Sequence, residues 1–173
     1  MPQLISLGAR AADRYALLRV VASLADLPAA QPVIVPVALW TAWRAALVAR
    51  GDVGVWLAPA DDPAALVEDL ALVPLIAIDF PQFTDGRGYS HARLLRGRLG
   101  FLGELRAIGD IQRDQLYYLA QCGFDAFSIP DAMDAAAALK AFGDFSDGYQ
   151  ATERRLPWFR RRDLPAAPAV PPR

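Results

Sequence analysis

Four strand-like segments, each followed by a stretch of helical pattern, constrain the fold more than any other feature of this sequence. They lie at 53–57, 74–80, 103–110 and 125–131. Their length suits buried strands, and the stretches after them place apolar residues three and four positions apart, as on one face of a helix. Strands separated by single helices pair in parallel, with right-handed crossovers. The sequence therefore predicts an α/β fold of repeated strand-helix units with a mainly parallel sheet.

The helices have recognisable ends. They are expected at 61–72, 88–100, 111–123 and 132–142. Asp110 and Asp131 stand where side chains cap helix starts, and Gly100 and Gly123 stand where glycine ends a helix. The acidic pairs Asp61/Asp62 and Asp131/Asp134 are explained by these helix starts, without catalytic work.

The number of units decides between related architectures. An earlier strand within 32–40, leading into a helix at 40–51, brings the count to about five, whereas a full TIM barrel has eight units in about 250 residues. We therefore expect a short open sheet or a partial TIM-like barrel, with a flavodoxin-like sheet as the alternative. The expected organisation is one α/β domain over 1–150, an arginine-rich segment over 151–163 and a disordered proline-rich tail over 164–173.

Composition excludes several classes of function. The chain has a single cysteine, Cys122, and a single histidine, His91, so it can form no internal disulfide, iron–sulfur cage or multi-histidine metal site. No apolar stretch approaches the roughly 20 residues of a membrane span, and the first residues do not resemble a secretory signal, so we expect a cytoplasmic protein. A net charge of -1 gives no general attraction to nucleic acid. We expect no metal, and no cofactor fingerprint is evident.

Polar residues follow the expected strands, at the edge where parallel α/β sheets bind ligands. The candidate ligand-binding residues are Asp79, Asp85, Arg87, Tyr89, Asp110 and Arg113. One interpretation is an anion or phosphate site, in which glycines allow close approach and Arg87 supplies a planar fork. The other is structural: Asp85 and Gly86 form a turn, Gly88 opens a helix and Arg87 pairs with a neighbouring acid. The segment matches no glycine-rich phosphate motif, so we favour the structural interpretation.

Two single residues have a functional and a structural interpretation. His91 lies early in an expected helix beside the ligand edge and could act as an acid or base, but one histidine there is more often a surface residue. Cys122 ends a helix, where the dipole disfavours a thiolate, so we expect a small buried side chain.

An arginine cluster near the carboxyl terminus is a candidate for partner binding. Its residues are Arg154, Arg155, Trp158, Arg160 and Arg161. Arginines interleaved with aromatic residues can grip an acidic protein surface or nucleic acid. Alternatively, the apolar residues pack this segment onto the domain while the arginines stay in water.

Residues 75–127 closely resemble an uncharacterised bacterial family that is described as a probable oxidoreductase involved in sulfite reduction. The matching positions are Asp79–Pro81, Thr84–Ser90, Gly103–Ala107, Gly109–Asp110, Arg113–Leu116 and Cys122–Phe127. The resemblance implies a pathway, because this family is typically encoded beside assimilatory sulfite reductase. It supplies no catalytic residues.

Sulfite reduction itself needs siroheme and an iron–sulfur cluster, which one cysteine cannot hold. We therefore expect an accessory protein that acts with sulfite reductase or its electron donor. The alternative is a small α/β enzyme or anion-binding protein whose site is the strand edge. A homo-oligomer, in which a second copy completes the sheet, also fits the sequence.

Overall fold

The computed structural model describes residues 3–145, which form one curled sheet and five α-helices. The strands are β1 (Gln3–Ser6), β2 (Ala9–Ala11), β3 (Ala16–Leu17), β4 (Val33–Pro36), β5 (Val53–Leu57), β6 (Leu75–Phe80), β7 (Glu104–Gly109) and β8 (Ala126–Ile129). The α-helices are α1 (Val37–Ala42), α2 (Arg44–Arg50), α3 (Arg87–Arg93), α4 (Leu116–Gln121) and α5 (Ala135–Ala141). Shorter helical turns are η1 (Leu24–Asp26), η2 (Pro63–Leu66), η3 (Leu94–Arg98) and η4 (Arg113–Gln115). The predicted α/β class is confirmed.

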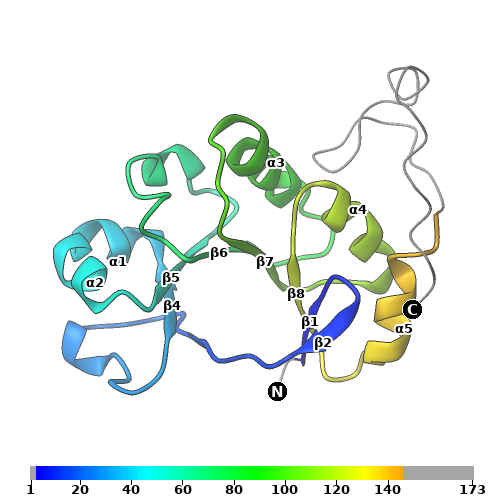
Figure 1. The fold of residues 1–173 in the computed structure, drawn as a ribbon, viewed down its shortest axis with the longest axis horizontal. Coiled ribbons are helices and arrows are strands. Elements are labelled where there is room, and N and C mark those ends of the chain that lie inside the picture. The colour runs from blue at the N-terminus through cyan, green and yellow to red at the C-terminus, as the bar shows by residue number, and fades with distance from the viewer. Residues whose placement is uncertain (1–2, 146–173) are drawn as a thin grey trace, which may run out of the picture.

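The strand order is β2-β1-β8-β7-β6-β5-β4-β3. From β3 to β8 all neighbours are parallel and follow chain order, whereas β1 is antiparallel to both β8 and β2. Right-handed crossovers between successive parallel strands place their helices on one face of the sheet. Figure 1 shows this arrangement, with the helices outside an arc of strands.

The sheet has to curl because its two edge strands are close together in the chain. Only residues 12–15 separate β2 from β3, although these strands lie at opposite edges. The step from Ala11 to Ala16 spans at most about 18 Å, whereas eight strands laid flat would span roughly 34 Å. The amino-terminal segment therefore crosses the inner side of the arc like a chord (Figure 1).

The two faces of the sheet differ in character. The helix-covered face carries the main core, to which β6 contributes Ile76, Ile78 and Phe80. The inner face carries a smaller apolar cluster made of Ile34, Leu75, Ala77 and Ile108, packed against Tyr15 and Trp56. Successive strand residues point to opposite faces, and both faces of β6 are covered. All six residues of β6 are therefore buried.

The strands predicted from 53 onward are confirmed, with small differences at their ends. The helix predicted at 88–100 is also present, because α3 continues directly into the π turn η3. Gly100 and Gly123 end their helical segments with φ of +67° and +107°, values that glycine adopts without strain.

The helix predicted at 61–72 is wrong in extent, because only η2 forms there. Asp62 caps this turn by accepting from the amide of Ala64 at 2.9 Å. The chain then continues through turns, since the carboxylate of Asp69 is drawn inward by the indole of Trp40 at 2.7 Å. Tertiary contacts thus override the local helical pattern.

Two predicted helix caps are also wrong. Gln112, and not Asp110, precedes η4. Helix α5 begins after Asp134, whose carboxylate accepts from the amides of Ala136 and Ala137. Asp131 lies in a turn closed by the amide of Met133 and the carbonyl of Pro130, which delays the helix start.

Candidate functional site

The loop between β6 and α3 forms a turn built on an aspartate and an arginine. The carboxylate of Asp85 accepts from the backbone amide of Arg87 at 3.1 Å and pairs with its guanidinium, with Nη2 at 2.7 Å from Oδ2. The Arg87 guanidinium lowers the pKa of Asp85 to about 2. A Cβ on Gly88 would lie 2.5 Å from Cζ of Phe80, so packing alone requires this glycine. The expected turn and ion pair are therefore present.

Asp79 lies on the inner face of the sheet and binds a residue that sequence reasoning missed. Its two carboxylate oxygens accept from Nη1 and Nη2 of Arg19 at 2.6 and 2.8 Å. The same guanidinium lies 5.2 Å from the ring centre of Trp56. No local pattern marks Arg19, because it lies 60 positions before Asp79 and outside any helix or strand.

The remaining predicted residues at this edge have separate partners. Asp110 accepts from the amide of Phe83 at 3.1 Å and so ties the loops after β6 and β7 together. Tyr89 packs edge-on against Phe80, with ring centres 5.4 Å apart. Burial raises the pKa of Tyr89 to about 12. Arg113 turns toward α5, where its Nη1 lies 2.8 Å from Oδ2 of Asp144.

These contacts divide the predicted site among several places. Asp79 binds Arg19 on the inner face of the sheet. Asp85 and Arg87 pair with each other within one turn, and Arg113 pairs with Asp144 near the end of the described residues. Each of the charged candidates is engaged with another group of the protein, so the structure does not bring the six side chains onto one shared ligand position.

A second ionic group, which the sequence did not reveal, lies on the inner face. Arg106 of β7 is only 3% exposed and pairs through Nε with Glu104 at 2.8 Å. Its Nη1 pairs with Asp13 at 2.9 Å, and its guanidinium lies 5.6 Å from the ring centre of Tyr15. A buried charge inside an expected strand is the signal that could have indicated this group.

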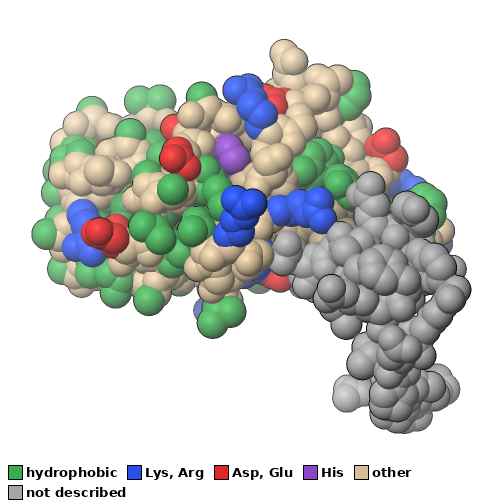
Figure 2. Space-filling view, turned by 90° about the horizontal axis from the view of Figure 1, so that it is seen from above, with side chains coloured by type: hydrophobic (Ala, Val, Ile, Leu, Met, Phe, Trp, Pro, Cys, Tyr) green, Lys and Arg blue, Asp and Glu red, His purple; other side chains and the backbone are tan. Residues whose placement is uncertain are grey.

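His91 has an unusual environment in α3. Its Nδ1 is buried and has no hydrogen-bond partner among the described residues. Burial lowers the pKa of His91, and Asp61 and Asp62 act in the opposite direction. Figure 2 shows the imidazole in purple at the surface, beside charged side chains of both signs. Cys122 is buried at 1% exposure, as expected for a structural residue.

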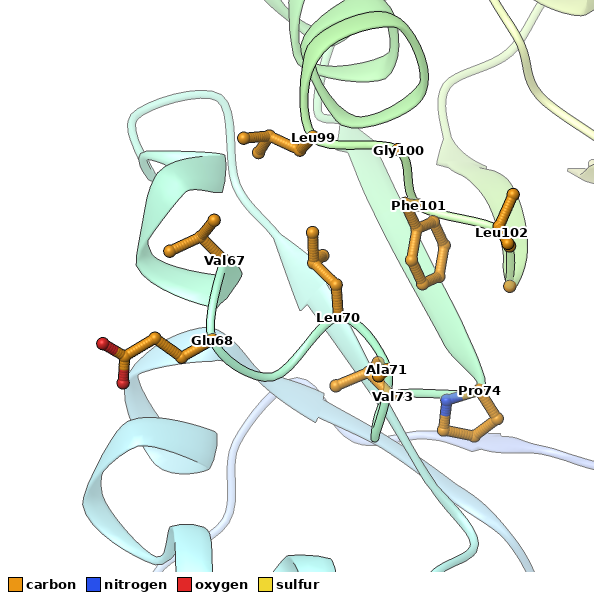
Figure 3. Close-up of a pocket in the computed structure, with 11 residues that line it drawn as sticks. Val67, Glu68, Leu70, Ala71, Val73, Pro74, Leu99, Gly100, Phe101 and Leu102 are labelled. Carbon is orange, nitrogen blue, oxygen red and sulfur yellow. The ribbon is translucent and has the colours of Figure 1, made fainter.

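An open apolar hollow of about 600 Å³ lies at the amino ends of strands β6 and β7, opposite the loops that carry the predicted site. Figure 3 shows its lining, which comes from the segment before β6 and the segment before β7. The lining residues are Val67, Glu68, Leu70, Ala71, Val73, Pro74, Leu99, Gly100, Phe101, Leu102 and Gly103. Leu102 is 95% exposed and Val67 is 52% exposed.

Other classes of site were sought over the same part of the chain. Within residues 3–145, no group of three or more His, Cys, Asp or Glu is arranged to hold a metal ion. None of the helices in this range has the length and apolar character needed to cross a membrane. The predicted partner-binding residues Arg154, Arg155, Trp158, Arg160 and Arg161 lie outside the described residues.

Comparison with known proteins gives a family but no activity. No curated protein matches the chain. A family model described as "Bacterial protein of unknown function (DUF934)" matches residues 54–159. The matched range begins within β5 and includes the apolar hollow, the Asp85–Arg87 turn and most of the arginine cluster. Because this match covers more than half of the chain, the protein belongs to this bacterial family of unknown function.

Proposed function

We propose that this protein is a non-catalytic accessory of assimilatory sulfite reduction that works by binding sulfite reductase or its electron donor. The resemblance of residues 75–127 supports the pathway. The charged candidates at the carboxyl ends of the strands already have partners within the protein. This favours a protein that acts by binding a partner over one that catalyses a reaction at these strand ends. The proposal places the protein in the cytoplasm.

The observation that carries the binding role is the apolar hollow. Contiguous exposed apolar side chains mark protein interaction sites when they gather into one patch. Val67 and Leu102 stand at 52% and 95% exposure on the two sides of the hollow, and Glu68 is its one charged lining residue. We assign the hollow, together with the arginine cluster beyond residue 150, to the partner-binding surface.

The test is binding to purified sulfite reductase and to its electron donor by biolayer interferometry. We expect a Kd near 1 μM, weakened at least about tenfold by Leu102→Glu, a loss of about 1.4 kcal/mol. Val20→Glu is the matched control, because Val20 is exposed to a similar degree, at 89%, and does not line the hollow. Deleting Glu153 to Arg173 should abolish binding. Absence of binding to both proteins at micromolar concentration would reject the proposal.

A second candidate is a small α/β enzyme or anion-binding protein with its site at the carboxyl ends of the strands. His91 favours it, because its Nδ1 is buried without a hydrogen-bond partner among residues 3–145, and a buried polar atom of this kind calls for a ligand. Sulfite, sulfate, phosphate esters, flavins and nicotinamides are the compounds to screen by thermal shift. A ligand at 100 times its Kd adds about 2.7 kcal/mol of stability. The candidate fails if no compound stabilises the protein or if Arg87→Ala leaves the stabilisation unchanged.

We also infer that the fold is a partial barrel. The parallel strands follow chain order, the helices lie on one face and the sheet curls. A flavodoxin-like sheet would instead reverse its strand order at a switch point.

Pairing of two copies is tested by sedimentation equilibrium, in which a monomer at all concentrations would reject a homo-oligomer.

A further inference from the structure

The segment of residues 12–31, which includes β3 and runs along the inner face of the sheet, lies near the surface. None of residues 12–31 is buried. The two-residue strand β3 supplies part of the attachment, through the amide of Leu18, which donates to the carbonyl of Ile34 at 2.9 Å. Trp56 adds a hydrogen bond from its indole to the carbonyl of Leu18 at 3.1 Å. Tyr15, Ala16, Leu18 and Leu27 pack against the core while only partly buried, and the ion pairs Arg19–Asp79 and Asp13–Arg106 hold the segment further. Elements without fully buried residues open locally at lower cost than the core, so this segment can leave the sheet without global unfolding.

Beneath the segment lies a receptor for one particular chemical group. The Asp79 side chain is 9% exposed, whereas the Arg19 side chain that binds it is 46% exposed. The two carboxylate oxygens of Asp79 accept two parallel hydrogen bonds from the edge of the guanidinium, and the Trp56 ring lies against its face. This arrangement suits a planar, forked group. The Asp79 carboxylate is buried, while the arginine that occupies it comes from a segment without fully buried residues.

The charge of the inner face selects a cation. Three carboxylates, those of Asp13, Asp79 and Glu104, face the two guanidinium groups of Arg19 and Arg106. When the segment leaves, it takes both Arg19 and Asp13 with it, so the carboxylates of Asp79 and Glu104 face Arg106 alone and the buried Asp79 carboxylate is left unpaired. Such a carboxylate is costly, so a cation is needed in its place.

We propose that Asp79 and Trp56 form a binding site for the guanidinium of an arginine side chain on a partner protein, and that Arg19 occupies this site until the partner displaces it. The site lies on the inner face and is separate from the apolar hollow, so it stands or falls independently of the sulfite-reduction role. A tethered group has an effective concentration on the order of millimolar, and Arg19 therefore competes strongly with any free guanidinium.

The first test uses the full chain with Arg19→Ala and N-methylguanidinium as the probe, followed through the Trp56 indole NMR signal. We expect a saturable shift, with binding at least about tenfold tighter than in the wild type, where Arg19 competes. Urea is the matched neutral probe and should cause no saturable shift. Adding Asp79→Asn should abolish the response. A folded Arg19→Ala variant with no saturable shift, or an equal shift after Asp79→Asn, would overturn the proposal.

The second test uses the wild-type protein and so does not depend on the folding of a variant. Hydrogen exchange should show the Leu18 amide opening at least about 100-fold more often than the amides of central strand β6. N-methylguanidinium should accelerate exchange at Leu18 and leave β6 unchanged. Exchange of Leu18 only through global unfolding would show that Arg19 never leaves Asp79, which contradicts the proposal.

Discussion

The indole nitrogen of Trp40 donates a hydrogen bond to Oδ2 of Asp69 over 2.7 Å, although 29 positions separate the two residues. Trp40 is 1% exposed and Asp69 is 5% exposed. Nε of Arg44 holds the other carboxylate oxygen, also at 2.7 Å, and this arginine lowers the pKa of Asp69. The contact joins α1 and α2 to the chain before β6, and it explains why that chain is not the predicted helix.

Removal of this carboxylate should be costly. Asp69→Ala leaves a buried indole donor and an arginine without their acceptor, so we expect the free energy of unfolding to fall by about 2–4 kcal/mol. Urea denaturation measures the loss. Asp52→Ala is the control, because Asp52 is 41% exposed in its pair with Arg50 and such pairs contribute about 0–1 kcal/mol. Equal losses in the two variants would contradict the role given to Asp69.

The two glycines around Arg87 should respond differently to alanine. A Cβ at Gly88 would meet Cζ and Cε1 of Phe80 at 2.5 and 2.8 Å, and Phe80 is itself 1% exposed and cannot easily move. We expect Gly88→Ala to destabilise the protein by about 1–3 kcal/mol. Gly86 has φ of -79° and no atom within 4 Å of its ideal Cβ, so Gly86→Ala should be neutral or stabilise by up to about 1 kcal/mol. Thermal unfolding of the pair distinguishes them, and similar losses would refute the packing explanation.

The Asp85–Arg87 pair should be lost only in strong acid. The folded pKa of Asp85, about 2, lies below its ordinary value of 3.8. The contribution of the pair is therefore present above pH 3.8 and disappears as the pH falls through about 2. A carboxyl ¹³C NMR titration should find the low pKa in the wild type and a return toward the ordinary value in Arg87→Ala. Arg113→Ala should leave it low, since Arg113 pairs with Asp144.

Tyr89 should limit stability in alkali. Burial raises its pKa from 10.0 to about 12, so the fold favours the neutral phenol. That contribution is complete below pH 10 and is lost as the pH rises through about 12. Tyr89→Phe should therefore flatten the fall of unfolding free energy over this interval, as measured by urea denaturation at each pH. Tyr118 is the comparison: its pKa is also raised, chiefly by the nearby Cys122, but the residue is 42% exposed, so Tyr118→Phe should leave most of the fall in place.

The central strands were predictable because their signals are local. Strand β5 coincides with the predicted segment 53–57, and β6 differs from its prediction only by the loss of Pro74. Gly100 and Gly123 end helical segments because they adopt positive φ, a property of the residue itself. The strands β1 and β2 could not be predicted in the same way, since they are short and depend on pairing with β8.

The contacts of the candidate site were also predictable only where the two residues are close in the sequence. Asp85 and Arg87 stand two positions apart, so their turn and ion pair follow from the local sequence. The partner of Asp79 stands 60 positions away and the Asp13 partner of Arg106 stands 93 away, in a segment with no regular pattern. Such pairs depend on the curl of the sheet, which brings its two edges together.

By itself, the sequence determined the repeated strand-helix units, the parallel pairing that such units require and the glycines that end their helices, because each depends on contacts within a few positions along the chain. Only the tertiary structure decided which charges meet. The sheet curls, so the chain on either side of β3 meets its inner face, where Asp13 before β3 pairs with Arg106 and Arg19 after β3 pairs with Asp79. Burial makes an opposite charge beside each of these groups necessary, since a charge removed from water is costly when it is left unpaired.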